Sequence, residues 1–192
     1  MTAPVAAGRA HLLGLYAETD DPWNFRSSSF EAERFAAVLN ALPRSNYESA
    51  LELGCGNGEL SRRIAPRCLS YTGLDAVPTA LAAARKVVPN GLFVEGFLPC
   101  PLPGTMHDLV LLSEVLYFLA ADAIRDVAGR IDAAWPRADV VTVTWRGPTG
   151  HLLSGEDAFA EYSNATQRQS HTVETDRRYR IAVFAPLPLP SP

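Results

Sequence analysis

Three glycines at alternate positions stand where a strand is expected to pass into a helix. They are Gly54, Gly56 and Gly58 of the stretch LELGCGNG. Missing side chains at such a junction let the chain turn sharply and let backbone amides approach a ligand. The dinucleotide pattern G-x-G-x-x-G would need its last glycine where the chain has Glu59, which disfavours a pyrophosphate clamp. By its spacing alone, the loop is equally compatible with a ligand cradle and with a plain turn.

Two acidic residues near this loop favour the cradle. Asp75 closes the next expected strand 21 positions after Gly54 (75 − 54 = 21). At that place in a doubly wound fold an acidic side chain accepts hydrogen bonds from both ribose hydroxyls of a nucleotide, although it could also cap the following helix. Glu52 lies inside an otherwise apolar strand, where a charge is costly unless it is hydrogen-bonded. We therefore expect Glu52 to accept from the glycine-loop amides or to bind the cationic end of a ligand.

The elements that must position these residues alternate along the chain. Short apolar runs alternate with segments of helical period, which is the pattern of a parallel sheet covered on both faces. The expected strands cover residues 50–53, 69–74, 92–97, 108–113 and 140–145. The expected helices cover residues 29–41, 59–65, 78–88, 122–134 and 154–162. Two last extended segments, 170–175 and 178–184, predict a closing hairpin.

This order of elements predicts an α/β fold. We expect a Rossmann-like, mostly parallel sheet of seven strands with helices on both faces and a C-terminal antiparallel hairpin. The chain has 192 residues and 47% hydrophobic content, which suffices for one domain with a sizeable core. The expected divisions are an N-terminal flap segment (residues 1–28), a single domain (29–186) and a disordered proline-rich tail (187–192).

Composition narrows the possible partners. The formal net charge is −4, and the 17 basic residues form no dense block. The sequence therefore carries no electrostatic footprint for nucleic acid or for an anionic membrane. No apolar run approaches the roughly 20 residues that span a bilayer. A small molecule or an oligosaccharide is the expected partner, bound by a monomer or small homo-oligomer.

The cysteines predict a reducing environment. Cys55, Cys68 and Cys100 are odd in number and lack the spacing of metal ligands. The segment APVAAG near the start is too short and too polar in its flanks for a secretion signal. We expect a cytoplasmic protein without a metal site.

The glycine loop and its downstream acid resemble motif I and the second strand of the class I S-adenosylmethionine-dependent methyltransferases. LELGCGNG matches the acidic-x-Gly-x-Gly-x-Gly pattern, and LDAVPTALAAAR matches the strand with the ribose acid. The likeness covers residues 50–145, and the hairpin extends it to residue 184. It implies a class I methyltransferase fold with S-adenosylmethionine as cofactor and S-adenosylhomocysteine as product. Asp75 would hold the ribose, and the methionine moiety would lie on Glu52 and on the loop residues Gly54, Cys55, Gly56, Asn57 and Gly58.

The expected adenine site departs from the family pattern. The third strand of such enzymes usually ends in an aspartate that contacts the adenine amine, whereas VEGFL offers Phe97 here. Adenine recognition would then rely on backbone groups and on stacking, which an aromatic ring can supply. Phe97 is equally compatible with a place in the core. We expect Ala76, Leu98 and Ser113 to complete the cofactor site.

A second resemblance narrows the family. TDDPWNFRSSSFEAERF (residues 19–35) and LLSEVLYFL (111–119) are similar to segments of the rhizobial nodulation protein S type of methyltransferase. That family N-methylates an amino sugar, the free amine of a deacetylated chitooligosaccharide. Trp23 suits a flap over the cofactor and could shield the sulfonium, since aromatic faces attract cations. Arg26 and Arg34 are candidates to pair with the methionine carboxylate, with a surface ion pair as the alternative for each.

The acceptor is expected at the carboxyl edge of the sheet, where ligands of open α/β sheets bind. Glu114 and Tyr117 follow the fourth expected strand there. Glu114 could hold an ammonium group and take its proton, because only the neutral amine attacks a methyl carbon. Otherwise Glu114 caps the following turn.

Histidine offers one further candidate. His151 lies in the loop after the fifth strand, in a segment that loosely resembles a Gly-His segment of the nodulation enzymes. It is expected to act as a base or sugar ligand, or else to be an exposed loop residue. Trp145, at the end of that strand, could stack on a sugar ring or simply pack. His11 is expected in a mobile N-terminal segment.

These observations predict methyl transfer from S-adenosylmethionine to a small or oligosaccharide acceptor, with the amine of an amino sugar preferred. Catalysis would depend mainly on the alignment of nucleophile, methyl carbon and sulfur. Two alternatives stay open at this point. One is a biosynthetic N- or O-methyltransferase with another acceptor, and the other is a cofactor-binding module without catalysis.

Overall fold

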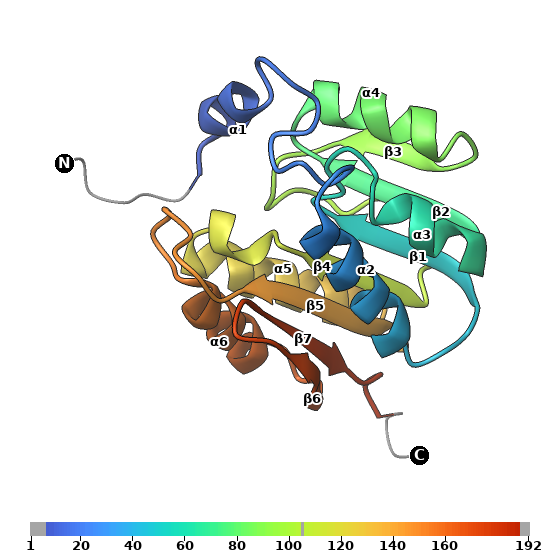
Figure 1. Cartoon of the computed structure of the whole chain (residues 1–192). Helices are drawn as coiled ribbons and strands as arrows, with labels where there is room; N and C mark the ends of the chain where they lie inside the picture. The colour runs from blue at the N-terminus through green and yellow to red at the C-terminus, as the bar shows by residue number, and fades with distance from the viewer. Residues whose placement is uncertain (1–6, 105, 189–192) are drawn as a thin grey trace.

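A single sheet organises the computed structural model, which describes residues 7–104 and 106–188 (Figure 1). Within these residues the strands are β1 (Tyr47–Leu53), β2 (Cys68–Asp75), β3 (Leu92–Glu95), β4 (Leu109–Ser113), β5 (Asp139–Trp145), β6 (Ser170–Thr175) and β7 (Tyr179–Phe184). Their order in the sheet is β3-β2-β1-β4-β5-β7-β6. Strands β1 to β5 pair in parallel, whereas β7 pairs antiparallel with both β5 and β6. The mostly parallel α/β sheet with a closing hairpin is thereby confirmed.

Helices cover both faces of this sheet. They are α1 (Arg9–Leu15), α2 (Ser29–Ala41), α3 (Ser61–Ile64), α4 (Pro78–Val87), α5 (Ala121–Ala134) and α6 (Gly155–Ala165). Two short 3-10 turns are η1 (Ala65–Arg67) and η2 (Leu116–Phe118). Figure 1 shows α1 apart from the others, beyond the carboxyl ends of the parallel strands.

The central strand β4 shows why the chain folds in layers. Leu109 and Leu111 pack under α2 and α3, while Val110 and Leu112 pack under α5 and α6. All four side chains are fully buried. A parallel strand covered on both faces must be apolar at every position, and LVLLS satisfies that requirement.

Most expected boundaries agree with the structure to within a few residues, and three differ for identifiable reasons. Strand β1 begins at Tyr47 rather than at residue 50, because Tyr47 pairs with Cys68. Strand β3 ends at Glu95 rather than at residue 97, since Glu95 is the last residue paired with β2. Helix α3 is shorter than the expected helix over residues 59–65, because the chain continues into η1 with its Pro66. The consequence for the site is that Phe97 lies in a loop.

Helix α1 had no counterpart among the expected helices. It has no buried residue, no side-chain cap and no acidic residue in its first turn. Leu12 and Leu15 are only partly buried, against a small cluster formed by Tyr16, Val77 and Ala80. A helix with so weak a local signal depends on tertiary contacts for its position.

The expected terminal divisions reach beyond the described residues. Residues 7–28 of the expected flap are described, and only Leu187 and Pro188 of the expected tail. The backbone amide of Leu187 donates to the carbonyl of Pro136 at 2.7 Å. The boundaries at residues 29 and 186 therefore stay a prediction.

Candidate functional site

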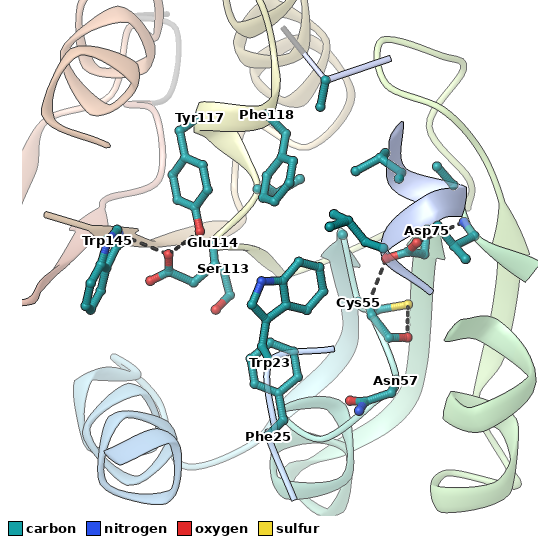
Figure 2. Close-up of a pocket in the computed structure, with 18 of the residues that line it drawn as sticks. Trp23, Phe25, Cys55, Asn57, Asp75, Ser113, Glu114, Tyr117, Phe118 and Trp145 are labelled. Atoms are coloured by element: carbon teal, nitrogen blue, oxygen red, sulfur yellow. Dashed lines mark hydrogen bonds between the residues drawn. The ribbon is translucent and has the colours of Figure 1, made fainter. Parts of the chain in front are cut away.

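A cavity of about 720 Å³ lies at the carboxyl ends of β1, β2, β4 and β5. Its wall is completed by residues of α1, by the segment before α2 and by the first turns of α2. Figure 2 shows Asp75 and Glu114 on opposite sides of this cavity, with Trp23 between them in that view. The cavity therefore brings the two predicted halves of the site, for cofactor and for acceptor, into one space.

The glycine loop bends between β1 and α3 with positive φ angles at all three glycines. Gly56 has φ 53°, and a Cβ there would lie 3.2 Å from the Tyr16 hydroxyl. Gly58 has φ 82°, and a Cβ there would lie 2.8 Å from the Cα of Ala84 on α4. Gly54, Cys55, Gly56 and Asn57 line the cavity, but Gly58 does not. The structure thus gives Gly58 a packing role against α4 in place of the predicted cofactor contact.

Asp75 presents its carboxylate to the loop. One oxygen accepts from the Gly56 amide at 2.8 Å, and the other accepts from the Val77 amide at 3.0 Å. Burial raises the pKa of Asp75, and the backbone hydrogen bonds oppose that shift. Asp75 does not cap α4, whose N-cap residue is Val77. The two backbone hydrogen bonds hold the Asp75 carboxylate at the cavity wall, where it could bind the hydroxyls of a ribose.

Glu52 has different partners from those expected. One carboxylate oxygen accepts from Ser61 Oγ at 2.5 Å and from the Tyr71 hydroxyl at 2.6 Å. The loop amides are used elsewhere: those of residues 54 and 55 donate to the Leu74 carbonyl. The prediction that these amides bind Glu52 was therefore wrong. Burial raises the pKa of Glu52 to about 7, and the side chain lines the cavity.

The residues present fit S-adenosylmethionine. Asp75 offers a carboxylate with no cationic partner among the described residues, which suits ribose hydroxyls. Asn57 holds a buried side-chain oxygen that lacks a hydrogen-bond partner among the described residues. Cys55, Ala76, Leu98 and Ser113 also line the cavity, as does Phe97, which is 37% exposed.

An aromatic cluster stands between the two halves. Trp23 stacks on Phe25 with ring centroids 5.6 Å apart, and it meets the rings of Tyr16 and Phe118 edge to face. All four rings line the cavity. Tyr16 was not singled out in the sequence, where it ends an ordinary apolar segment. Its contact with the glycine loop depends on the fold and leaves no local signature.

Arg26 lies outside the cavity wall. Its guanidinium forms two hydrogen bonds with Asp20, of 2.6 and 3.0 Å, and its side chain is 41% exposed. It is not among the lining residues. The surface ion pair, which was the alternative for this residue, is what the structure contains, and the predicted pairing with a methionine carboxylate lacks the geometry.

Arg34 is buried between two carboxylates. Its Nη1 lies 2.7 Å from Oε1 of Glu114, and its Nη2 forms an ion pair with Oε2 of Glu31. Both terminal nitrogens are thus engaged by the protein itself. The predicted role of Arg34 as partner of the methionine carboxylate is not the arrangement found, although Arg34 does line the cavity.

Glu114 is held firmly at the end of β4. Its Oε2 accepts from the Tyr117 hydroxyl at 2.7 Å and from the Trp145 amide at 3.0 Å, as Figure 2 shows. Its backbone has φ 57°, a conformation uncommon outside glycine. Burial raises the pKa of Tyr117 well above its usual value, so this hydroxyl remains a donor. Glu114 and Tyr117 are thus brought together as predicted.

His151 lies at the cavity wall next to a residue that was expected elsewhere. Its ring centroid is 4.4 Å from that of Phe118 and 5.7 Å from that of His11. Burial lowers the pKa of His151, and the neighbouring His11 adds to that shift. His11 is part of α1 and lines the cavity, and the mobility expected of its segment stays a prediction.

The described residues contain neither a candidate metal site nor a candidate membrane-spanning helix. No group of three or more His, Cys, Asp or Glu side chains is placed to hold a metal ion there. No helix among these residues is both long and apolar enough to cross a membrane.

Solved structures define the class to which this fold belongs. N-methyltransferase NodS from Bradyrhizobium japonicum WM9, in complex with S-adenosyl-L-homocysteine, superposes with a TM-score of 0.77 at 22% identity, covering 92% of this chain and 97% of that one. A putative methyltransferase from Pseudomonas syringae gives a TM-score of 0.70 at 27% identity, covering 82% of this chain and 99% of that one. The fold is that of the class I methyltransferases.

Sequence similarity identifies the family within that class. The family model for nodulation protein S (NodS) matches residues 5–133. The chain belongs to this family. Nodulation protein S of Sinorhizobium fredii is 29% identical over 150 residues, which make up 76% of this chain and 64% of that protein. The corresponding protein of Rhizobium tropici is 28% identical over 149 residues, or 75% of this chain and 58% of that protein. The chain thus spans less than two thirds of the length of either relative.

A more distant similarity is to an enzyme that is named for its acceptor. Trans-aconitate 2-methyltransferase of Escherichia coli is 33% identical over 95 residues, which are 47% of this chain and 38% of that protein. The name of that enzyme describes methylation of a tricarboxylic acid. The acceptor half of the present site therefore decides which chemistry to propose.

Proposed function

We propose that the protein transfers a methyl group from S-adenosylmethionine to an amine, in particular the amine of an amino sugar or of an aminated oligosaccharide. The observation that carries the proposal is the single cavity that joins the glycine loop and Asp75 to a buried cluster of Glu31, Arg34 and Glu114. Membership of the nodulation protein S family supports it.

The cofactor half follows from the loop geometry. Asp75 would accept from the ribose hydroxyls, and Glu52 with residues 54–57 would receive the methionine moiety. Phe97, with Leu98 and Ala76, would receive the adenine, and Trp23 would lie by the sulfonium. S-adenosylmethionine supplies a methyl carbon made electrophilic by the positive sulfur.

The acceptor half favours a cation over an anion. Two carboxylates face one guanidinium, so the cluster has an excess of negative charge. The rings of Phe30 and Trp145, 6.0 Å apart, line the cavity near this cluster and suit the apolar face of a sugar or an alkylammonium group. A carboxylate acceptor such as trans-aconitate would need a free cation, but Glu31 and Glu114 already neutralise Arg34.

Methyl transfer assays with isotope-labelled S-adenosylmethionine test this proposal. The acceptor panel contains glucosamine, chitosan oligomers, simple phenols and trans-aconitate. We expect labelled methyl groups on the amines. Labelled phenols or labelled trans-aconitate alone would replace the amine proposal with O-methylation in another pathway.

Titration calorimetry with S-adenosylmethionine and S-adenosylhomocysteine separates the enzyme from a binding module. If the protein binds neither compound, both the enzyme proposal and the binding-module alternative are overturned. Binding without turnover on any acceptor class would favour a cofactor-binding module that regulates a partner. A cytoplasmic location and a monomer or small homo-oligomer complete the proposal.

A further inference from the structure

The cluster of Glu31, Arg34 and Glu114, here called the acceptor cluster, contains one carboxylate, that of Glu31, that the sequence motifs did not indicate. Glu31 lies in the first turn of α2 and lines the cavity with only 9% of its surface exposed. Its side chain shares Arg34 with Glu114. The cluster thus holds two carboxylates, and the question is which of them is available to a ligand.

The local sequence offers Glu31 a structural role that its side chain does not take. Ser28 and Glu31 have the S-x-x-E spacing of a capping box, in which the glutamate reaches back to the N-cap amide. One half of the box is present, because Ser28 Oγ accepts from the Glu31 amide at 3.3 Å. The carboxylate, however, is engaged with Arg34 on the cavity side of the helix. Helix capping therefore does not account for its position.

The two carboxylates differ in how completely the protein occupies them. Glu114 has the Tyr117 hydroxyl and the Trp145 amide on one oxygen and Arg34 on the other. Among the described residues, the Glu31 carboxylate has one partner, Arg34. Neither ion pair of Arg34 is aligned as a hydrogen bond, because Glu31 Oε2, Glu114 Oε1 and Arg34 Nε are all buried without a hydrogen-bond partner among the described residues. Among the described residues, Glu31 Oε1 thus has no hydrogen bond or ion pair, whereas both oxygens of Glu114 have partners.

We propose that Glu31 is the catalytic base of this site: it binds the acceptor ammonium and takes its proton, while Arg34 and Glu114 position it. The inference rests on the proposed amine methylation and names the residue that prepares the amine. Glu114, predicted for this role from the sequence, becomes a positioning residue that holds Arg34 against Glu31.

The proton and electron balance is simple. The acceptor ammonium gives one proton to the Glu31 carboxylate, which becomes a neutral carboxylic acid, and the nitrogen keeps its lone pair. That nitrogen then forms a bond to the methyl carbon of S-adenosylmethionine, and the carbon–sulfur bond breaks with its electron pair on sulfur. The products are the methylated ammonium and neutral S-adenosylhomocysteine, and the Glu31 proton leaves to solvent.

The surroundings of Glu31 suit a group that gains and loses a proton. Burial raises its pKa, Arg34 opposes that shift, and the charges of Glu114 and Asp21 add to it. These groups come from α2 itself, from the turn after β4 and from the segment before α2. A general base works best when its pKa lies near the working pH, so a raised carboxylate pKa favours the role.

The test compares Glu31→Gln with Glu114→Gln and with a matched control on the same helix. The control is Glu33→Gln, because Glu33 is exposed and lies outside the cavity wall. We measure kcat/KM against pH for glucosamine and for a more basic aliphatic amine. Calorimetry with glucosamine, in the presence of S-adenosylhomocysteine, gives acceptor binding without turnover, and thermal unfolding shows whether each variant folds.

In the wild-type protein the acidic limb of kcat/KM should fall at the same pH for both amines, because it reports Glu31. Glu31→Gln should lose about 10²-fold in kcat/KM near neutral pH, and its limb should move to the pKa of whichever amine is used. Glucosamine affinity should fall at least tenfold while S-adenosylhomocysteine affinity stays unchanged. Glu114→Gln should lower kcat without moving the limb to the pKa of the amine, and Glu33→Gln should match the wild type.

Two other results would overturn the inference in distinguishable ways. If Glu31→Gln folds and matches Glu33→Gln in the limb and in glucosamine binding, Glu31 is not the base and amine methylation stands. The same conclusion follows if Glu114→Gln, and not Glu31→Gln, makes the limb follow the amine. If the wild-type protein neither binds nor methylates an amine, the proposed function fails and this inference fails with it.

Discussion

The two halves of the cavity differ in what shapes them: backbone geometry around Asp75 and side-chain ion pairs around Arg34. Around Asp75 the geometry comes from the backbone: positive φ angles at the glycines and amides that donate to one carboxylate. Around Arg34 it comes from side chains: two neighbours on α2, Glu31 and Arg34, and the distant Glu114, joined by ion pairs. A cofactor common to many enzymes can be met by a backbone pattern, whereas an acceptor particular to one enzyme needs a specific set of side chains.

This difference predicts that the two halves fail in different ways. The acceptor half contains buried charges, so a substitution there should first cost stability. The cofactor half contains few groups whose loss leaves a charge unpaired, so a substitution there should first cost affinity. The predictions below test this separation from the largest expected effect to the smallest.

Arg34→Met removes the cation shared by the carboxylates of Glu31 and Glu114, of which Glu31 is buried and Glu114 mostly buried. Breaking one side of a buried ion pair costs about 3–5 kcal/mol, because an uncompensated charge remains. We expect the free energy of unfolding in urea to fall by that amount while the folded protein still binds S-adenosylhomocysteine. Arg26→Met, at an exposed pair, is the control and should cost less than about 1 kcal/mol. A loss of cofactor affinity as large as that in Asp75→Ala would remove the proposed division.

Glu52→Gln tests a buried charge beneath the cofactor half. The pKa of Glu52 is raised from 4.5 to about 7, so between these values the folded protein holds a proton that the unfolded chain has released. This group therefore lowers the stability of the wild type as pH rises through that window, by about 3 kcal/mol in total. The glutamine variant should equal the wild type at pH 4 and exceed it at pH 8 in urea titrations. Glu48→Gln, exposed on the same strand, should run parallel to the wild type.

Asp75→Ala removes the carboxylate expected to bind the ribose. Losing a charge-assisted hydrogen-bonding group costs about 1.5–3 kcal/mol, which corresponds to more than a tenfold loss of affinity. Calorimetry with S-adenosylhomocysteine measures the loss, and circular dichroism checks the fold. Unchanged affinity in a folded variant would remove Asp75 from the ribose role.

Phe97→Ala should have the smallest effect. Phe97 lines the cavity in the loop after β3, and stacking contributes about 0.5–1.5 kcal/mol, so affinity for S-adenosylhomocysteine should fall by several-fold. Leu92→Ala, exposed on β3, serves as the control for loss of apolar surface. Equal affinities of the two variants would assign adenine recognition to backbone groups alone.

The cofactor half was predictable from the sequence because its signals are local. Glycines and one acid at a fixed spacing place a loop at the end of β1 and a carboxylate at the end of β2, and the structure has both. What the spacing could not supply was the division of labour within the loop. Packing between elements decides that Gly58 lies against α4 and that the amides of residues 54 and 55 donate to the Leu74 carbonyl rather than to Glu52.

The acceptor half was predictable only in part. Glu114 and Tyr117 lie three positions apart after a buried strand, and their position followed from the strand order. Glu31 could not be assigned to the site from the sequence, because the S-x-x-E spacing is already accounted for by the start of a helix. Only the ion pair with Arg34 in the folded structure shows that its carboxylate faces the site. Arg26 and Arg34 look alike in sequence, yet burial separates a surface pair from the centre of the cluster.

Helix α1 is the part of the cavity wall with the lowest expected local stability. It contributes His11, Leu12 and Leu15 to the lining but contains no buried residue of its own. Segments with little buried apolar surface open at low free-energy cost, whereas β4 at the centre of the sheet opens only when the whole domain unfolds. Amide hydrogens of α1 should therefore exchange with deuterium much faster than those of β4. A ligand that fills the cavity adds contacts to α1, so we expect it to slow amide exchange in this helix more than in β4.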